Sequence, residues 1–195
     1  MKQLLSTLAL LLCVSTSAQA ATFLSTSGSP ANIVSDYSDA GLISFDLDMA
    51  NFIPTVLNYE ITAADIGSPL INNSISFNAL VRNLTGTGLD YLSVSLSSAS
   101  FDAIGTVTRQ FGGSFTINTS NNGQNALISF SSPEFLDIFI GAPLAGAGEI
   151  DWSIKTAGFN AGDRLSITIA VPEPETYAML LAGLALIAGA VRLRR

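Results

Sequence analysis

The stretch that decides the fold is Ile43-Ser44-Phe45-Asp46-Leu47-Asp48-Met49, because apolar and polar residues alternate along it without exception. A period of two puts alternate side chains on opposite faces of a β-strand, so the pattern predicts a strand with one face in a core and the other in solvent. The same alternation, in places imperfect, recurs at 57–61, 75–81, 92–96, 150–154 and 165–169, with shorter candidates at 115–117 and 127–130.

Turn-forming residues separate these runs, such as Thr85-Gly86-Thr87-Gly88 and Asn121-Asn122-Gly123. About eight short strands at this spacing predict an all-β fold for residues 21–170, an antiparallel β-sandwich of jelly-roll or immunoglobulin-like outline. One helix is expected from Ser132 to Gly141, since a serine can cap it and Pro133 suits its first position.

Charge and residue usage exclude several functional classes. Residues 21–170 carry four basic and 13 acidic side chains, a net charge of −9, which disfavours a nucleic-acid partner. The chain has no histidine, and its single cysteine, Cys13, lies near the N-terminus. A Ser–His triad, a disulfide and a thiol nucleophile are therefore not expected in the body, nor is a cofactor. Its stability must come from a hydrophobic core.

Residues 1–20 form a predicted secretory signal peptide. Lys2 supplies its positive charge, a mostly apolar stretch follows, and Ala18-Gln19-Ala20 has the small-x-small pattern that signal peptidase accepts. Cleavage is expected before Ala21. An uncleaved N-terminal anchor is the alternative; a lipoprotein at Cys13 is disfavoured because bulky residues precede that cysteine.

The other end of the sequence has three parts: residues 171–175 around Pro172-Glu173-Pro174, a segment 176–191 whose apolar run extends from Tyr177 to Val191, and Arg192-Leu193-Arg194-Arg195. Each proline fixes its own φ and pushes the residue before it towards the extended geometry that a protease or transpeptidase binds. The apolar run predicts a transmembrane helix of about 22 Å, which is shorter than a bilayer core of about 30 Å. The positive-inside rule keeps the arginines cytoplasmic and the body outside.

This layout resembles the PEP-CTERM family of sorting signals, with Pro172-Glu173-Pro174 at the position of the family's namesake motif and Arg192, Arg194 and Arg195 as its basic retention tail. The resemblance implies export into the periplasm of a Gram-negative bacterium and transient retention in the inner membrane. It also implies processing by an exosortase, a membrane cysteine transpeptidase, followed by delivery to the outer surface or the medium. A tail-anchored protein with a proline-bearing linker is the alternative.

Glu149-Ile150-Asp151-Trp152 is the most enzyme-like fragment of the body. Its two carboxylates share a strand face, and paired carboxylates are the minimum for glycoside hydrolysis. It resembles the motif of laminarinase-like jelly-roll glycosidases, but the second glutamate of that motif is missing. A solvated strand face is the favoured interpretation, and no catalytic residue is predicted. The phase of Trp152 favours a core position over a sugar-stacking platform.

Two further patterns are candidate binding sites. The densest acidic cluster comprises Asp36, Asp39, Asp46 and Asp48, and oxygen ligands suit Ca²⁺. Its spacing matches no calcium loop, so solvated carboxylates are favoured and no metal site is predicted. An ice-binding face needs a repeated threonine array, whereas the chain offers only the isolated pairs Thr106/Thr108 and Ser166/Thr168.

The sequence thus predicts an exported, non-catalytic protein of the cell surface or extracellular matrix, such as that of a biofilm. Its expected partners are signal peptidase, an exosortase-type transpeptidase and, transiently, the inner membrane. The alternative is a carbohydrate-binding module retained in exopolysaccharide. A glycan-active enzyme is the third class.

Overall fold

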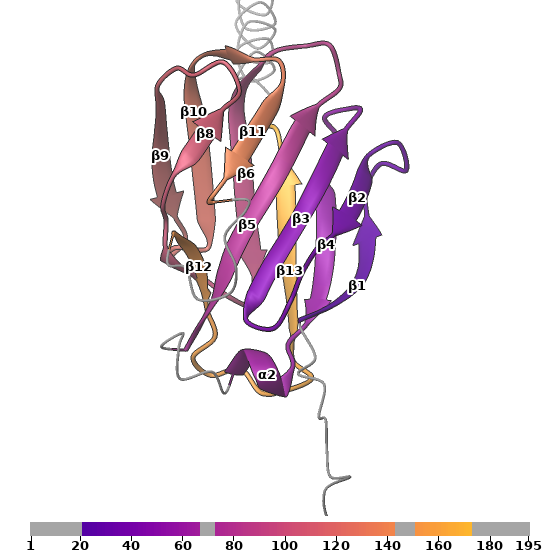
Figure 1. Cartoon of the computed structure of the whole chain (residues 1–195), viewed down its shortest axis with the longest axis vertical. Helices are drawn as coiled ribbons and strands as arrows, with labels where there is room; N and C mark the ends of the chain where they lie inside the picture. The colour runs from indigo at the N-terminus through magenta and orange to yellow at the C-terminus, as the bar shows by residue number, and fades with distance from the viewer. Residues whose placement is uncertain (1–20, 67–72, 143–150, 173–195) are drawn as a thin grey trace, which may run out of the picture.

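The computed structural model describes residues 21–66, 73–142 and 151–172, and this part is all-β apart from one short helix (Figure 1). Sheet A has six strands in the order β1 (Thr22–Ser27), β4 (Thr55–Glu60), β13 (Arg164–Ala170), β6 (Leu89–Ser97), β10 (Asn125–Glu134) and β9 (Phe115–Ser120). Sheet B has seven strands, β2 (Ile33–Asp36), β3 (Leu42–Met49), β5 (Ser74–Asn83), β11 (Asp137–Ile140) and β8 (Val107–Arg109), with β12 (Trp152–Lys155) joining β5 to β7 (Phe101–Ala103). The helix is α2 (Ala63–Ile66). The all-β prediction is confirmed.

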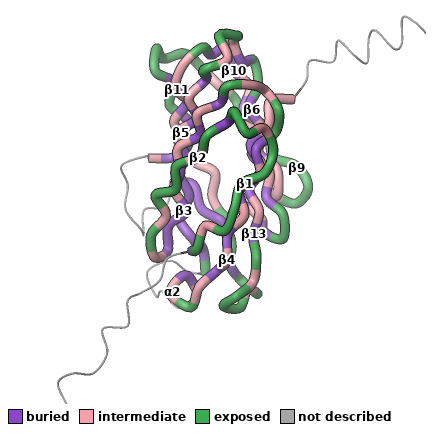
Figure 2. Tube along the Cα trace, turned by 90° about the vertical axis from the view of Figure 1, so that its right-hand side faces the viewer, coloured by how far each residue is buried: buried purple, intermediate pink, exposed green. Residues whose placement is uncertain are grey.

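The two sheets form two layers, and their inward side chains belong to one hydrophobic cluster (Figures 1 and 2). The prediction of which strand residues face the core is confirmed in both layers: Phe45 of β3 is 1% exposed and Ile167 of β13 is fully buried. The aromatic rings of Phe45, Phe77, Phe101 and Trp152 meet in sheet B, where the Trp152 ring centroid lies 6.1 Å from that of Phe77 and 5.3 Å from that of Phe101. The core therefore rests on apolar burial, as the absence of cysteine from the body requires.

The prediction of a wholly antiparallel fold is wrong at one pair of strands. β3 and β5 run parallel, from Leu42 beside Ser76 to Met49 beside Asn83. The reason lies in the connection between them. After β3 the chain crosses to sheet A as β4, returns through α2, and re-enters sheet B from the end where β3 began. Every other strand pair in the described residues is antiparallel.

The helix predicted from Ser132 to Gly141 is also wrong. β10 continues through Glu134, the chain turns at residues 135–136, and β11 returns alongside β5. The Glu134 side chain is buried against Arg109 and so cannot act as an exposed acid in a first helical turn. In β11, Ile138 and Ile140 are buried while the residues between them are half-buried, which is the period of a strand.

We expect the loss of stability caused by a substitution in β13 to depend on whether the residue faces the core or solvent. Ile167→Ala should lower the free energy of unfolding by about 2–5 kcal/mol, because it opens a cavity between the sheets. Thr168→Ala, one residue further on the outward face, should change it by about 0.5 kcal/mol or less. Chemical denaturation followed by circular dichroism measures both values, and equal losses would contradict the assigned faces.

Candidate functional site

The predicted sorting motif follows directly from the middle of sheet A. β13 pairs with β4 on one side and β6 on the other, and its last pair joins Ala170 to Ser93. Val171 comes next and packs against the core cluster, and Pro172 is the last described residue. No spacer separates the central strand from the motif. Whatever acts on the motif must therefore approach this end of the folded body, called here the β13 end.

Most of the predicted site residues lie outside the described part of the chain. Of the sorting motif only Pro172 is described, whereas Glu173, Pro174 and the arginines 192, 194 and 195 are not. The signal peptide 1–20, with Ala18 and Ala20, and the predicted helix 176–191 are likewise outside it. Within the described ranges, no helix combines the length and apolar character needed to cross a membrane.

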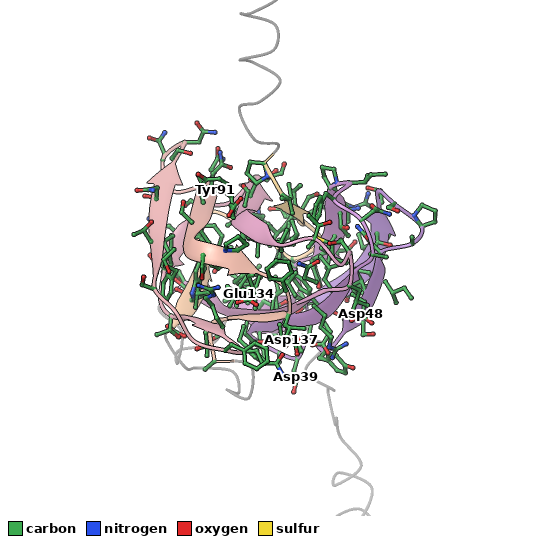
Figure 3. The ribbon with its side chains drawn as sticks, turned by 90° about the horizontal axis from the view of Figure 1, so that it is seen from above. Asp39, Asp48, Tyr91, Glu134 and Asp137 are labelled. Atoms are coloured by element: carbon green, nitrogen blue, oxygen red, sulfur yellow. The ribbon has the colours of Figure 1, made fainter. Side chains whose placement is uncertain are left out.

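A buried ion pair organises the β13 end. Arg109 of β8 donates from Nε to Oε2 of Glu134 in β10 at 2.7 Å, and the two side chains are 5% and 4% exposed. The guanidinium also donates to the carbonyl of Ser132 at 3.0 Å and lies 5.3 Å from the centroid of the Phe130 ring. Figure 3 looks onto this end and labels Glu134 near its middle. Each charge thus has a close partner of opposite sign, which a buried ion requires.

Glu134 and the neighbouring Asn83 also hold two of the connecting loops. The other oxygen of Glu134, Oε1, accepts from the backbone N–H groups of Phe135 and Leu136 at 2.9 and 3.0 Å, which fixes the β10–β11 turn. Asn83, at the end of β5, donates to the carbonyls of Glu134 and Thr87, at 3.0 and 2.7 Å. No sequence pattern considered above predicts this cluster. The available signal was the phase of Arg109, which shares a strand face with Val107 and so points inward.

The enzyme-like fragment has a structural role in the part that is described. Glu149 lies outside it, but Asp151 accepts two hydrogen bonds from Thr106, from the backbone N–H and from Oγ1, both at 2.7 Å. Trp152 is 1% exposed and donates from Nε1 to the Thr106 carbonyl at 2.8 Å. Through these hydrogen bonds to Thr106, both side chains hold the loop between β7 and β8 in place. The core prediction for Trp152 is confirmed.

The acidic cluster is spread over separate contacts. Asp46 and Asp48 point outward from β3 and pair with Arg82 of β5 at 2.6 and 2.7 Å. Asp36 accepts a hydrogen bond from the phenol of Tyr59 at 3.1 Å; burial, above all, raises the pKa of that phenol, so it stays protonated and donates. Asp39 accepts from the next backbone N–H in its turn. Among the described residues, no three acidic, histidine or cysteine side chains form a group that could hold a metal ion.

The threonine pairs do not share a face. Ser166 and Thr168 lie on the outward face of sheet A, where Ser166 donates to Asn58 at 2.7 Å. Thr106 is bound to Asp151, and Thr108 pairs with Phe139 at the edge of sheet B. The two pairs therefore belong to different layers and form no common array.

A shallow hollow lies at the end opposite to Pro172. It has a volume of about 370 Å³ and is lined by Ser98, Ala99, Ser100, Asn122, Gln124, Lys155, Ala157 and Phe159. A second hollow of about 350 Å³ shares Phe159 with it and adds Asp163 and Arg164. A half-buried aromatic ring thus stands beside amide, hydroxyl and ammonium groups, a combination that can bind a small polar ligand.

The ion pair at the β13 end should be worth far more to stability than the exposed pairs on sheet B. Glu134→Ala should lower the free energy of unfolding by about 3–5 kcal/mol, because it leaves a buried guanidinium without its counter-charge. Arg82→Ala, which breaks two partly exposed pairs, should cost about 1 kcal/mol or less. Urea denaturation of both variants tests this, and a small loss for Glu134→Ala would show that Arg109 finds another partner.

Comparison with known proteins identifies one region of the chain. Residues 170–195 match the model of the PEP-CTERM protein-sorting motif, starting at the last residue of β13. No curated protein and no solved structure matches the chain. The match confirms the resemblance seen in Pro172-Glu173-Pro174, and it indicates an exported protein that an exosortase processes at the membrane. The chain carries a PEP-CTERM protein-sorting motif at its C-terminal end.

Proposed function

We propose that the chain is an exported, non-catalytic β-sandwich module of the cell surface or extracellular matrix, delivered by its sorting tail. The observation that carries the proposal is the position of the motif, which begins at Ala170 where the central strand of sheet A ends. The folded body is therefore the direct cargo of the tail. Removal of the tail beyond Pro172 would leave every described strand in place.

The chemistry of the tail accounts for both steps of delivery. The apolar run 176–191 followed by three arginines holds the chain in the inner membrane with the body in the periplasm. Pro172 and Pro174 keep the segment next to the membrane extended, so that its backbone is open to a transpeptidase. Cleavage there releases the body from the membrane. The released body then passes to the outer surface or the medium.

A non-catalytic role is supported by the structural hydrogen bonds and ion pairs that engage several carboxylates of the body. Asp151, the described half of the enzyme-like fragment, already accepts two hydrogen bonds from Thr106. Glu134 is neutralised by Arg109 in the core, and Asp46 and Asp48 pair with Arg82. With no histidine in the chain, general-base chemistry at neutral pH would have to come from a group whose ordinary pKa lies further from neutrality, such as a carboxylate or Lys155.

The hollow around Phe159 supports a second candidate function, retention in exopolysaccharide by glycan binding. Its ring, with Asn122, Gln124 and Lys155 beside it, offers an apolar surface and hydrogen-bonding groups to a sugar. The hollow lies at the end opposite to Pro172. While the tail is in the membrane, the hollow would face away from the membrane and towards the matrix.

Replacing Pro172, Glu173 and Pro174 with alanine should block processing and leave membrane insertion intact. The apolar length and the positive charge that direct insertion are unchanged, so the longer, membrane-bound form should accumulate. Cell fractionation and mass spectrometry of the C-terminus, with and without the exosortase, measure this. Replacing Arg192, Arg194 and Arg195 with alanine is the matched control, which should weaken retention instead. Wild-type protein that keeps Arg195 at steady state in its host would contradict the proposal.

Phe159→Ala should lower binding to the host's exopolysaccharide by about tenfold, if the hollow contributes a typical ring contact of about 1.4 kcal/mol. A polysaccharide pull-down measures the loss. Phe111→Ala, which removes an exposed ring at the β13 end, is the matched control and should bind like wild type. Equal binding by all three proteins would exclude the hollow as a glycan site without touching the sorting proposal.

A further inference from the structure

The β13 end carries one exposed large hydrophobic side chain on each of four connecting loops. These loops comprise residues 50–54, 84–88, 110–114 and 135–136, and each joins one sheet to the other at that end. The exposed side chains are those of Ile53 (56% exposed), Leu84 (60%), Phe111 (80%) and Phe135 (54%). They are called here the loop hydrophobics.

Strand pairing places these loops beside the exit of the tail. Thr55, two residues after Ile53, pairs with Ile169 of β13, and Ser93 of β6, which follows loop 84–88, pairs with Ala170. The β10–β11 turn contacts the same loop, since Phe135 and Gly88 lie side by side. Loop 110–114 is tied to the turn through the hydrogen bond from the Gln110 N–H to the Asp137 carbonyl, at 3.2 Å.

The opposite end differs in its exposed side chains. Among the described residues there, only Tyr37 is a large hydrophobic residue with comparable exposure on a loop, at 60%. A single exposed hydrophobic residue is ordinary, whereas a group of four at one end of a small domain indicates a contact surface.

Charge distribution favours a lipid partner for the β13 end. The four loops contain no Asp, Glu, Lys or Arg residue, although the body as a whole has a net charge of −9. A bacterial inner membrane is anionic, and an acidic surface would be repelled by it. The four loops therefore give the β13 end uncharged tips that can contact such a membrane, with Asp48, Asp90 and Asp137 set back at the strand ends beside them.

The length of the tail brings this end to the membrane. The apolar run begins at Tyr177, only five residues after Pro172, and five extended residues span at most about 18 Å. That distance is comparable to the polar headgroup region together with one loop. A body tethered so closely cannot keep its β13 end away from the bilayer surface.

We propose that the loop hydrophobics dock into the interface of the membrane that holds the tail. Phe111 and Phe135 enter the headgroup boundary, where aromatic rings are favoured, and Ile53 and Leu84 contact the acyl chains next to it. Docking fixes the height of the Pro172-Glu173-Pro174 segment above the bilayer until the tail is cut. The inference rests on the proposed membrane retention of the tail.

The buried ion pair prepares this surface in advance. Arg109 immediately precedes loop 110–114, and its partner Glu134 immediately precedes Phe135 and accepts that residue's N–H. The ion pair thus fixes the backbone directly before two of the four loop hydrophobics, so less ordering of that backbone is needed on contact with lipid. Four partly exposed side chains give weak, reversible binding on their own, which suits a body that must leave after cleavage.

A single-cysteine fluorescence experiment tests the docking. The chain is purified from membranes of an exporting bacterium without exosortase, so that the tail stays and the leader with Cys13 is removed. Phe111→Cys and, as the matched control, Tyr37→Cys are labelled with an environment-sensitive fluorophore. The proteins are reconstituted into phosphatidylethanolamine–phosphatidylglycerol vesicles with or without a shallow nitroxide-labelled lipid. Flotation first shows whether the chain is held by the vesicles.

The probe at position 111 should be quenched by the nitroxide lipid at least about threefold more than the probe at 37, as expected for a side chain at the interface. In a chain with Phe135→Ser and Leu84→Ser, the quenching at 111 should fall. Vesicle-bound protein with equal, weak quenching at both positions would overturn the docking and leave the sorting proposal intact. A fluorescence change of the label at position 111 that depends on the number of protein molecules per vesicle, and not on the nitroxide lipid, would also overturn the docking. It would indicate contact with a second copy of the chain. Protein that fails to float would instead overturn the membrane retention itself.

Discussion

The pairing of β13 in the middle of sheet A is the constraint on which the rest of the structure depends. β13 joins the β1–β4 pair to the β6–β10–β9 group, and its inward residues lie in the core between the layers. Its partners are remote in sequence: Ser166 bonds to Asn58, 108 residues earlier. Sheet A can therefore close only when this last strand of the body is available.

The same strand determines what surrounds the motif. Because β13 is central, the residues beside its end come from both neighbouring strands and from the loops that cross to sheet B. The buried Arg109–Glu134 pair lies beneath these loops. Separating its two charges would leave each buried without a counter-charge, so loop movements that break the pair are strongly disfavoured. In the proposed docking, the shortness of the tail would transmit the position of the body to the motif.

The sequence predicted the strands whose two faces differ most. Residues 43–49 and 165–169 have strict alternation, and both are strands of a layer with one face in the core. β1 and β2 were missed because they are edge strands with mostly exposed residues, so their side chains carry little periodic signal. The false helix at 132–141 followed from local capping preferences. They were overridden by the contact of Glu134 with Arg109, 25 residues away, which no local pattern records.

For the candidate site, sequence and structure contribute different parts. The Pro-Glu-Pro motif is read from adjacent residues, so its recognition needs no fold. The cluster around Glu134 and the gathering of Ile53, Leu84, Phe111 and Phe135 at one end depend on strand order, which alternation cannot supply. Loops are variable in sequence and carry no period, so single exposed hydrophobic residues in them look incidental until the topology brings them together.

The two ends of the body impose an order on its processing. Ala21, the expected first residue after leader cleavage, is 2% exposed and lies in the core cluster, near the end opposite to Pro172. A peptidase that cuts before Ala21 would find no free backbone there in the folded body, so we expect the predicted leader to be removed while the chain is still unfolded during export. The tail differs from the leader in this respect. Sheet A is completed by β13, and the motif starts where β13 ends, so the body can fold before the motif is cut. Its cleavage would then act on a folded body, so we expect the surface of the β13 end to matter to the tail and that of the opposite end not to matter to the leader.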